Sequence, residues 1–429
     1  MKRIAFQTLG CKLNFSETST LSRQFNDHGF SQVHFNEPAD IYVINSCSVT
    51  KNAEKRCKEL IRKSLRKNPD AHIAVIGCFS QINPEEISKI PGVGIVLGNA
   101  DKFNLFEHIK RLENPAKPQS ADVAVSEPES FVPGFSMDDR TRSFFKIQDG
   151  CDYFCAYCTI PLARGRSRSN TIAQTIETAR QIAGTNTREV VLSGVNIGDF
   201  GKEHGETFSG FLKELVKVEG LERVRISSIE PDLLTDEIIK QVADSPVLMP
   251  HFHIPLQAGS DQVLKAMGRR YDTAVFRSRV EKIKQLMPHA CIAADLIVGF
   301  PEETEELFME SYDFVKDSDV SYIHVFTYSE RDNTRALNFD QQVPGNVRSE
   351  RSKAFQKLSS HKKNEFYLQN KGYTSRVLWE KDNVKGFMFG FTENYIKVKQ
   401  AFDPEKVNSI EEINLVNFLE SESVYFYGD

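Results

Sequence analysis

Short apolar runs alternate with amphipathic helical patterns over the first 113 residues of the chain. The apolar runs have the length and composition of buried strands and lie at 4–8, 41–46, 73–76 and 95–97. Apolar residues recur at helical spacing between and after them, at 16–27, 53–67, from 84 onward and at 102–112. Because such alternation is typical of parallel strands covered by helices, the pattern predicts an open parallel sheet for residues 1–113.

The alternation resumes over residues 143–346 with six further strand patterns, at 144–148, 189–192, 224–228, 252–255, 292–298 and 322–328. Helical patterns separate these strands at 172–183, 208–218, 236–243, 274–287 and 303–316. A closed barrel of alternating strands and helices needs eight such units. Six units therefore predict a partial, open (β/α)6 barrel.

The remaining segments differ in pattern from these two α/β regions. Residues 114–142 are rich in Pro, Ser and Ala without periodicity and are predicted to be a linker. A basic helical stretch is predicted at 347–370. Residues 371–429 contain short strand patterns and predict a small β-barrel, with strands at 375–379, 386–391, 395–398, 413–418 and 424–427. The predicted fold class is therefore α/β with a small β-domain at the C-terminal end.

Composition and charge limit the classes of protein to which this chain can belong. The chain has 429 residues and a formal net charge of −5, so contact with nucleic acid has to come from local basic patches. No apolar run approaches the roughly 20 residues that span a bilayer, and the N-terminus lacks the apolar stretch of a signal peptide. We expect a cytoplasmic protein. Its eight cysteines then favour metal binding or catalysis over a disulfide framework.

Three of the cysteines, Cys151, Cys155 and Cys158, form the most informative motif of the chain. The intervals of four and three positions allow one short loop to present three thiolates to one metal centre. A structural zinc site needs four ligands, whereas an iron–sulfur cube with three cysteines keeps one iron open for a cofactor. The spacing, with Tyr157 before the last cysteine, resembles the signature of the radical S-adenosylmethionine superfamily. The alternative is a zinc site closed by a distant histidine.

Three other cysteines directly follow strands of the predicted N-terminal sheet. Cys11, Cys47 and Cys78 come after the first, second and third strand. The carboxyl ends of parallel strands meet at one edge of the sheet, so these thiols are expected to form a second three-cysteine metal centre. The alternative is that all three are small core residues. Cys57 lies on an apolar helix face and Cys291 inside a strand, and both are expected to pack in the core.

Polar side chains follow the second and third strands of the predicted barrel. In radical S-adenosylmethionine barrels, which this region resembles, these strand ends hold the amine, carboxylate and ribose of the cofactor. By that resemblance we expect cofactor contacts at Ser193, Asn196, Ser228 and Glu230.

Positive charge is concentrated in three stretches of this acidic protein. The 53–67 helix carries seven Lys and Arg against two Glu, and residues 348–363 carry six further cations. Such stretches are either solvated faces or phosphate-contacting surfaces. Arg164, Arg166 and Arg168 follow the cysteine loop closely and suit recognition of a phosphate or carboxylate. In contrast, residues 371–429 contain seven Lys and Arg against ten Asp and Glu. The charge of this part therefore does not indicate that it binds nucleic acid.

The order of these parts resembles the methylthiotransferases along almost the whole chain. The C-terminal part of that family is a TRAM domain. The resemblance rests on five segments, at 8–14, 45–50, 77–78, 151–158 and 253–260. Within the family, Gly-Cys-Lys-Leu-Asn at 10–14 and Cys-Ser-Val-Thr at 47–50 look most like the branch that acts on threonylcarbamoyladenosine in tRNA.

The resemblance implies an enzyme with S-adenosylmethionine and two 4Fe–4S clusters. Cys151, Cys155 and Cys158 would hold the cluster that cleaves S-adenosylmethionine to a radical. This radical would take the hydrogen from carbon 2 of the adenine next to the anticodon. Cys11, Cys47 and Cys78 would hold an auxiliary cluster that delivers sulfur, which a second S-adenosylmethionine methylates. The TRAM domain would grip the tRNA stem-loop, together with the basic stretches at 53–67 and 348–363.

The substituent on the adenosine separates the branches of this family. A threonylcarbamoyl group carries a carboxylate and a hydroxyl, so its pocket is expected to contain a cation from the 164–168 run or the Arg269-Arg270 pair. An isopentenyl group needs an apolar pocket. Three further functions compete with the tRNA branches: a ribosomal-protein aspartate methylthiotransferase, an iron–sulfur electron carrier and a zinc-bound RNA module. An enzyme of this type also needs an electron donor of the flavodoxin or ferredoxin type and a sulfur source.

Overall fold

A six-stranded parallel sheet forms the N-terminal part of the computed structural model, which describes residues 1–48, 50–112, 121–137 and 141–428. Its strand order is β2-β1-β3-β4-β5-β6. The strands are β1 (Arg3–Thr8), β2 (Ser31–Gln32), β3 (Ile41–Ser46), β4 (His72–Gly77), β5 (Val93–Leu97) and β6 (Asp122–Ala124). Both faces of this sheet are covered, which explains why β3 is buried at every position. The predicted parallel sheet is confirmed.

The helices of this part pack on the two faces of the sheet. Leu60 and Ile61 of α2 belong to one apolar layer, and Leu21 of α1 and Ile109 of α5 belong to the other. The Thr50 hydroxyl caps α2 by accepting a hydrogen bond from the Ala53 amide at 3.2 Å. The helices are α1 (Lys12–Asp27), α2 (Lys51–Lys67), α3 (Cys78–Ile82), α4 (Pro84–Ser88), the 3-10 helix η1 (Asp101–Asn104) and α5 (Leu105–Leu112).

The segment predicted as a linker contains two short strands. β6 extends the N-terminal sheet beyond β5, and β7 (Gly134–Phe135) pairs antiparallel with the first barrel strand. Pro- and Ser-rich sequence gives little periodicity, so both edge strands were missed. Residues 113–120 and 138–140 of the predicted linker lie outside the described residues.

Six parallel strands form the central part and are arranged as two three-stranded groups, β8-β11-β12 and β13-β14-β15. A parallel bridge from Ser228 to His253 joins the groups, so the strands curve into a partial barrel as predicted. The strands are β8 (Arg142–Lys146), β11 (Glu189–Ser193), β12 (Arg223–Ile226), β13 (His251–Gln257), β14 (Cys291–Val298) and β15 (Tyr322–Thr327).

Helices cover the outside of the barrel, and short elements lie at its ends. The five predicted helices are α7 (Ile172–Ala183), α8 (Phe208–Leu215), α9 (Asp236–Asp244), α11 (Thr273–Leu286) and α12 (Glu305–Asp317). The sequence patterns did not predict α6 (Ile160–Arg164), α10 (Asp261–Met267), the antiparallel pair β9 (Gln148–Asp149) and β10 (Arg168–Ser169), or the 3-10 helices η2 (Ile197–Asp199), η3 (Lys202–His204) and η4 (Arg335–Asn338). These short elements shape the mouth of the barrel, where local contacts outweigh periodicity.

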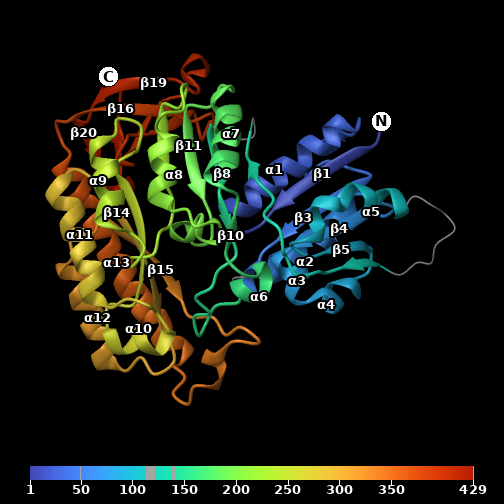
Figure 1. The fold of residues 1–429 in the computed structure, drawn as a ribbon, viewed down its shortest axis with the longest axis horizontal. Helices are drawn as coiled ribbons and strands as arrows, with labels where there is room; N and C mark the ends of the chain where they lie inside the picture. The colour runs from blue at the N-terminus through green and yellow to red at the C-terminus, as the bar shows by residue number, and fades with distance from the viewer. Residues whose placement is uncertain (49, 113–120, 138–140, 429) are drawn as a thin grey trace.

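The C-terminal part is one long helix followed by a six-stranded sheet of order β19-β16-β17-β18-β21-β20. The C-terminal sheet lies against the amino ends of the barrel strands. Among the hydrogen bonds that join them there, Arg142 of β8 donates to the Tyr395 hydroxyl at 3.0 Å, and Arg223 of β12 donates to the Phe391 carbonyl at 3.2 Å. Figure 1 shows this sheet in red across one end of the barrel and the N-terminal sheet in blue at the side. The elements are α13 (Gly345–Gln369), β16 (Thr374–Trp379), β17 (Phe387–Phe391), β18 (Lys397–Ala401), η5 (Pro404–Lys406), β19 (Ile410–Asn414), β20 (Asn417–Leu419), η6 (Glu420–Glu422) and β21 (Val424–Phe426).

Three of the six Lys and Arg side chains of α13 form hydrogen bonds or ion pairs inside the protein. Arg348 donates to the Tyr328 carbonyl and to Glu330 at 2.6 Å, and Arg351 pairs with Glu303 at 3.2 Å. Lys362 donates to the Ser318 carbonyl at 2.7 Å. The prediction that residues 348–363 form a basic surface is therefore wrong for these three cations, because long Lys and Arg side chains pack along the barrel with their charged ends satisfied.

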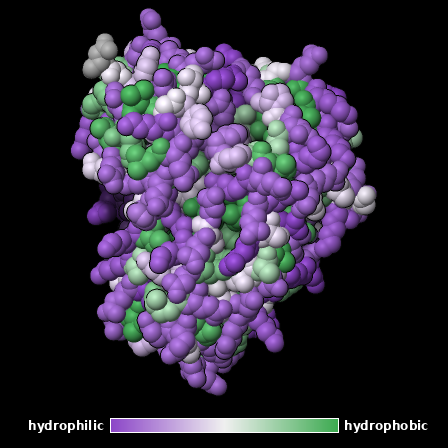
Figure 2. Space-filling model, turned by 90° about the vertical axis from the view of Figure 1, so that its left-hand side faces the viewer, coloured by the Kyte–Doolittle hydropathy of each residue, from purple (hydrophilic) through white to green (hydrophobic). Residues whose placement is uncertain are grey.

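The outer helices present polar side chains to solvent. Figure 2 shows hydrophilic side chains over most of the face that lies to the left in Figure 1, with hydrophobic ones in small, separate groups. This distribution is expected for helices whose apolar residues pack on the strands beneath. Among the described residues, no helix has the length and apolar character to cross a bilayer.

Candidate active site

The three cysteines of the N-terminal part meet at the carboxyl edge of its sheet. Cys11 precedes α1, Cys47 directly follows β3, and Cys78 begins α3 directly after β4. β1, β3 and β4 are adjacent and in parallel register, so the three positions lie side by side. The predicted convergence of strand ends is therefore present, and three thiols at one edge of the sheet form a donor set that suits an iron–sulfur cluster.

Two glycines allow this close approach. Gly10 has φ of +97°, and a Cβ atom there would lie 2.7 Å from Cys47 Cβ and 2.8 Å from Cys47 Sγ. Gly77 has φ of +95°, and a Cβ atom there would lie 2.4 Å from the Asn45 side-chain oxygen. Only glycine satisfies both the backbone conformation and the lack of space. The sequence thus places a glycine before Cys11 and before Cys78 for the same steric reason.

The second cysteine set lies on one loop at the mouth of the barrel. Cys151 follows β9, and the chain turns through Phe154, which has φ of +49°, before it reaches Cys155 and Cys158. Burial raises the pKa of the Cys151 and Cys158 thiols to about 12. Metal binding would replace these protons, since thiolates and not thiols are metal ligands.

A cavity of about 500 Å³ lies next to this loop. Its volume is within the usual range of small-molecule sites. All three cysteines line it, together with residues from the carboxyl ends of the barrel strands. Thr50, three residues after Cys47, lines it from the N-terminal part. The other main lining residues are Tyr153, Tyr157, Val195, Ser228, Glu230, Pro255, Gln257, Arg269, Asp295, Ile297, Tyr328 and Arg331. The cavity therefore connects the cysteine loop with the part of the chain that carries Cys47.

Glu230 and Arg269 form an ion pair on the wall of this cavity. Arg269 also donates a hydrogen bond to Cys155 Sγ at 3.1 Å. Burial raises the pKa of the Glu230 carboxyl, and the Arg269 charge opposes this rise. Arg269 thus links a predicted metal ligand with a predicted cofactor residue, and the adjacent Arg270 donates to the Asp152 carbonyl at 2.7 Å.

The four predicted cofactor residues occupy two kinds of position. Ser228 and Glu230 line the cavity, whereas Ser193 and Asn196 are buried outside its lining residues. The Ser193 hydroxyl donates to the Val191 carbonyl at 3.1 Å, and the Asn196 amide donates to Asp199 at 3.0 Å. The Asn196 side-chain oxygen is buried and has no partner among the described residues, so it can still accept a hydrogen bond.

The arginines of the 164–168 run do not supply the expected cation to this cavity. Arg164 is 1% exposed and pairs with Asp149 at 2.8 Å and with Glu17 at 3.1 Å. Arg168 is also buried and pairs with Asp149 at 3.2 Å, while the Arg166 side chain is 76% exposed. Of the two sources predicted for this cation, the Arg269-Arg270 pair supplies it, since Arg269 lines the cavity, whereas Arg164 and Arg168 are held by the buried carboxylate of Asp149.

Arg331 is a cavity cation that sequence reasoning missed. It lies in the loop after β15, is 6% exposed, and forms an ion pair with Glu54 of α2 across the two parts of the molecule. Its Nε atom is buried and has no partner among the described residues. A single arginine in a polar loop gives no periodic signal, so only the position of the loop at a strand end could have marked it.

The last two cysteines pack as predicted. Cys57 is 0% exposed among apolar residues of α2 and the sheet, and Cys291 is 1% exposed at the start of β14. Burial raises the pKa of both thiols to about 12. Both therefore behave as small apolar residues.

Two family models match the chain. The model described as "Uncharacterized protein family UPF0004" matches residues 3–98, and the Radical SAM superfamily model matches residues 145–315. The first range contains the cysteines of the N-terminal sheet, and the second contains the loop from Cys151 to Cys158.

Curated relatives match over nearly the full length. "Threonylcarbamoyladenosine tRNA methylthiotransferase MtaB" of Bacillus subtilis (strain 168) is 38% identical and covers 97% of this chain and 94% of its own. The protein of the same name from Aquifex aeolicus (strain VF5) is 36% identical and covers 93% and 96%. This chain belongs to the radical S-adenosylmethionine methylthiotransferase family. Another relative, "tRNA-2-methylthio-N(6)-dimethylallyladenosine synthase" of Clostridium tetani (strain Massachusetts / E88), is 31% identical and covers 96% and 93%.

Solved structures confirm the fold of this methylthiotransferase. A radical S-adenosylmethionine methyltransferase, TsrM from Kitasatospora setae, superposes with a TM-score of 0.55 at 14% sequence identity, covering 76% of this chain and 75% of that one. At this identity the likeness concerns the fold alone. The family membership makes the protein an enzyme with S-adenosylmethionine and 4Fe–4S clusters as cofactors, and both three-cysteine sites have donor sets that suit such clusters.

Proposed function

We propose that this enzyme inserts a methylthio group at carbon 2 of N6-threonylcarbamoyladenosine, next to the anticodon of tRNA. The observation that carries the proposal is the similarity, over 87–97% of the chain, to five proteins named for this reaction at 33–38% identity, of which three reach 36–38%. Relatives named for the dimethylallyl substrate are 31–34% identical. The motifs at 10–14 and 47–50 favour the same branch.

The loop at the barrel mouth is the proposed site of radical formation. Cys151, Cys155 and Cys158 would hold a 4Fe–4S cluster beside the 500 Å³ cavity. When bound there, the cluster supplies the electron that splits S-adenosylmethionine and so makes an unactivated aromatic C–H bond reactive. Radical chemistry suits this substrate, because carbon 2 of adenine offers no acidic proton and no leaving group.

Polar groups around the cavity are the proposed contacts of S-adenosylmethionine. Ser228 and Glu230 face the cavity and can accept hydrogen bonds from an amine or ribose hydroxyls. Ser193 and Asn196 lie outside the residues that line the cavity, at and after the end of the neighbouring strand β11, and the unpartnered oxygen of Asn196 is the group there that can accept a further hydrogen bond. The position of Ser228 and Glu230 near the cysteine loop keeps the cofactor between the cluster and the substrate.

Cys11, Cys47 and Cys78 are the proposed ligands of the auxiliary cluster that donates sulfur. Thr50, three residues after Cys47, lines the cavity, so the N-terminal part contributes to the wall of the space proposed for the substrate. The arrangement lets the N-terminal part and the barrel share one reaction chamber.

The substrate's carboxylate is proposed to bind Arg331. This arginine lines the cavity that the cysteine loop also lines, and its buried Nε atom has no partner among the described residues. An isopentenyl group would leave this buried donor unsatisfied, which costs free energy. The charge of Arg331 therefore favours the threonylcarbamoyl substituent.

The tRNA backbone is proposed to contact the outer face of α2. Lys55, Arg56, Arg62 and Arg66 are exposed there, and Arg331 pairs with Glu54 at the same helix, next to the cavity. The C-terminal sheet lies at the other end of the barrel from the cysteine loop. Phosphate contacts near the anticodon would thus come from the N-terminal part. An electron donor of the flavodoxin or ferredoxin type, a sulfur source and a cytoplasmic location complete the proposal.

Nucleoside analysis of tRNA from a strain that lacks the gene tests this function. The methylthiolated form of threonylcarbamoyladenosine should disappear while its precursor accumulates, and a plasmid copy of the gene should restore it. Loss of methylthiolated isopentenyladenosine instead would place the enzyme in the other tRNA branch. If neither nucleoside changes and ribosomal-protein aspartate loses its methylthio group, the substrate is a protein.

We expect Arg331→Gln to lower the rate of methylthiolation of threonylcarbamoyl tRNA about 10- to 100-fold, as is typical for the loss of a charged hydrogen bond. Cleavage of S-adenosylmethionine should persist. The measurement is product formation per deoxyadenosine released. Glu54→Gln breaks the same ion pair but keeps the arginine, so it should retain most of the rate, and so should Arg166→Gln at the exposed arginine. If Arg331→Gln and Glu54→Gln lower the methylthiolation rate equally, the effect comes from loss of the ion pair between the two residues, and Arg331 does not recognise the substrate.

A further inference from the structure

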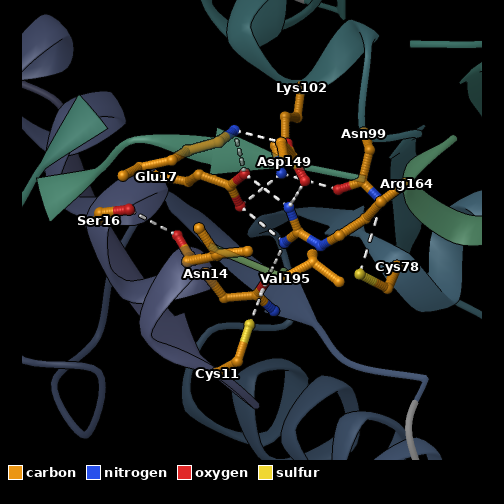
Figure 3. Close-up of polar contacts among 12 residues, drawn as sticks. Cys11, Asn14, Ser16, Glu17, Cys78, Asn99, Lys102, Asp149, Arg164 and Val195 are labelled. Atoms are coloured by element: carbon orange, nitrogen blue, oxygen red, sulfur yellow. Dashed lines mark hydrogen bonds and ion pairs between the residues drawn. The ribbon is translucent and has the colours of Figure 1, made fainter. Parts of the chain in front are cut away.

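A buried network of six charged side chains lies between the N-terminal part and the barrel. Figure 3 shows four of them, Glu17, Lys102, Asp149 and Arg164, near Cys11 and Cys78. Glu17 of α1 pairs with Lys102 of η1 at 2.5 Å, with Lys146 of β8 at 2.9 Å and with Arg164 of α6. Asp149 pairs with Lys146 at 2.7 Å and with Arg164 and Arg168. Every one of these side chains is at most 6% exposed. The network holds α1 and η1 of the N-terminal part against β8, β9 and α6 of the barrel.

The barrel side of this network brackets the cysteine loop. Asp149 lies two residues before Cys151. α6 begins two residues after Cys158, and its first amide, that of Ile160, donates to Cys158 Sγ at 3.5 Å. The network therefore fixes both ends of the loop.

Two asparagines connect the other end of the network to the N-terminal cysteines. The Asn14 amide nitrogen donates to the Leu9 carbonyl at 2.7 Å and to the Ser46 carbonyl at 3.0 Å, so it spans the chain before Cys11 and before Cys47. Its oxygen accepts a hydrogen bond from Arg164 at 2.5 Å. One side chain thus ties two cysteine loops to α6.

Asn99 performs the equivalent task for the third cysteine. Its amide nitrogen lies 3.5 Å from Cys78 Sγ and donates to the Ala163 carbonyl of α6 at 2.7 Å. Its oxygen accepts from Lys102 at 2.8 Å. Asn99 is 4% exposed, so its polar atoms depend on these partners for their hydrogen bonds. Figure 3 shows Asn99 between Lys102 and Cys78, and Asn14 between Arg164 and Cys11.

The network also has an excess of positive charge. Its four cations, Lys102, Lys146, Arg164 and Arg168, face two carboxylates, Glu17 and Asp149. A buried excess charge is costly unless a counter-charge lies close by. A cluster held by three thiolates is anionic, and Cys11 and Cys78 lie within electrostatic reach of Arg164. Positive charge and N–H donors near the sulfurs both make an iron–sulfur cluster easier to reduce.

We propose that Asn14 and Asn99 are positioning residues that hold the auxiliary cluster against α6, and that Asn99 and Lys102 raise the reduction potential of that cluster. The inference rests on the proposed role of Cys11, Cys47 and Cys78. Its consequence is that the sulfur donor and the radical site keep a fixed separation. Electron transfer to the auxiliary cluster also becomes easier than in a neutral surrounding.

The test measures the midpoint potential of the auxiliary cluster alone, by spectroscopic redox titration. The starting protein carries Cys151→Ala, Cys155→Ala and Cys158→Ala, so only the auxiliary cluster remains. Asn99→Asp keeps the acceptor for Lys102, removes the donor to Cys78 and adds a negative charge, and the last two changes should both make the potential more negative. Lys102→Met leaves Asn99 in place and should shift the potential in the same direction. Asn104→Ala, at an exposed asparagine of the same 3-10 helix, should leave it unchanged.

The outcomes separate this inference from the proposed function. If the starting protein holds no iron, the auxiliary-cluster role of Cys11, Cys47 and Cys78 fails, and the inference falls with it. If it holds iron and both Asn99→Asp and Lys102→Met have the potential of Asn104→Ala, the inference alone is overturned. In the otherwise unaltered enzyme, Asn14→Ala should release more deoxyadenosine per methylthiolated product than Asn104→Ala does. An unchanged ratio would contradict the positioning role.

Discussion

Alanine at Cys151, Cys155 or Cys158 is expected to abolish the reductive cleavage of S-adenosylmethionine. The three thiols lie on one loop and line one cavity, and a cube with only two protein ligands and an open iron is poorly held. The measurement is deoxyadenosine formation by the reconstituted enzyme with a chemical reductant. Each single variant should fall to the background without enzyme.

A matched control for this loop is Cys291→Ala. Cys291 lies in the barrel at the opposite end of the strands, packed against the C-terminal sheet. This variant should form deoxyadenosine at the normal rate, although the lost sulfur contacts cost about 1 kcal/mol of the free energy of unfolding. Normal deoxyadenosine formation by a variant of Cys151, Cys155 or Cys158 would overturn the assignment of the radical site.

Joint replacement of Cys11, Cys47 and Cys78 by alanine is expected to stop sulfur insertion while some cofactor cleavage remains. Iron should fall from about eight to about four atoms per chain, because one of two four-iron cubes is lost. The barrel and its cysteine loop form a separate site, so deoxyadenosine should still appear. The measurements are iron content, deoxyadenosine and methylthiolated nucleoside from the same preparation.

Cys57→Ala provides the control for this second set. Cys57 lies in the same sheet region but within the apolar layer under α2. Full iron and normal product are expected, together with a modest loss of stability from the smaller side chain. A loss of iron in Cys57→Ala, or full iron without Cys11, Cys47 and Cys78, would contradict the crevice at the strand ends as the auxiliary site.

The elements that periodicity predicted are those with long apolar patterns. β3, β14 and α7 lie where the sequence placed them, because each buries a continuous strand or one helix face. The sequence also grouped the cysteines correctly at strand ends, since parallel topology places carboxyl ends together. The sequence patterns do not predict α3, α6 and β6, because these short elements carry neither the continuous apolar run of a buried strand nor a full amphipathic repeat.

The tertiary structure determines which charged side chains are buried in ion pairs and which line the cavity. Arg164 and Arg269 are both candidates for the cation that binds the substrate, yet of these two only Arg269 lines the cavity, and Arg164 pairs with Glu17, 147 residues away along the chain. Arg351 belongs to a basic helix, yet it is buried against Glu303. Arg331 lies in a polar loop without hydrophobic periodicity, yet it lines the cavity.

The sequence by itself determined the two groups of three cysteines, the α/β layers and the family of this protein. Those features depend on local spacing and on hydrophobic burial, which a linear pattern records. Only the tertiary structure decided which cations are paired inside the protein and which face the cavity. Charge pairing depends on partners from distant segments, and a side chain such as Arg164 has the same local sequence whether it is buried or free.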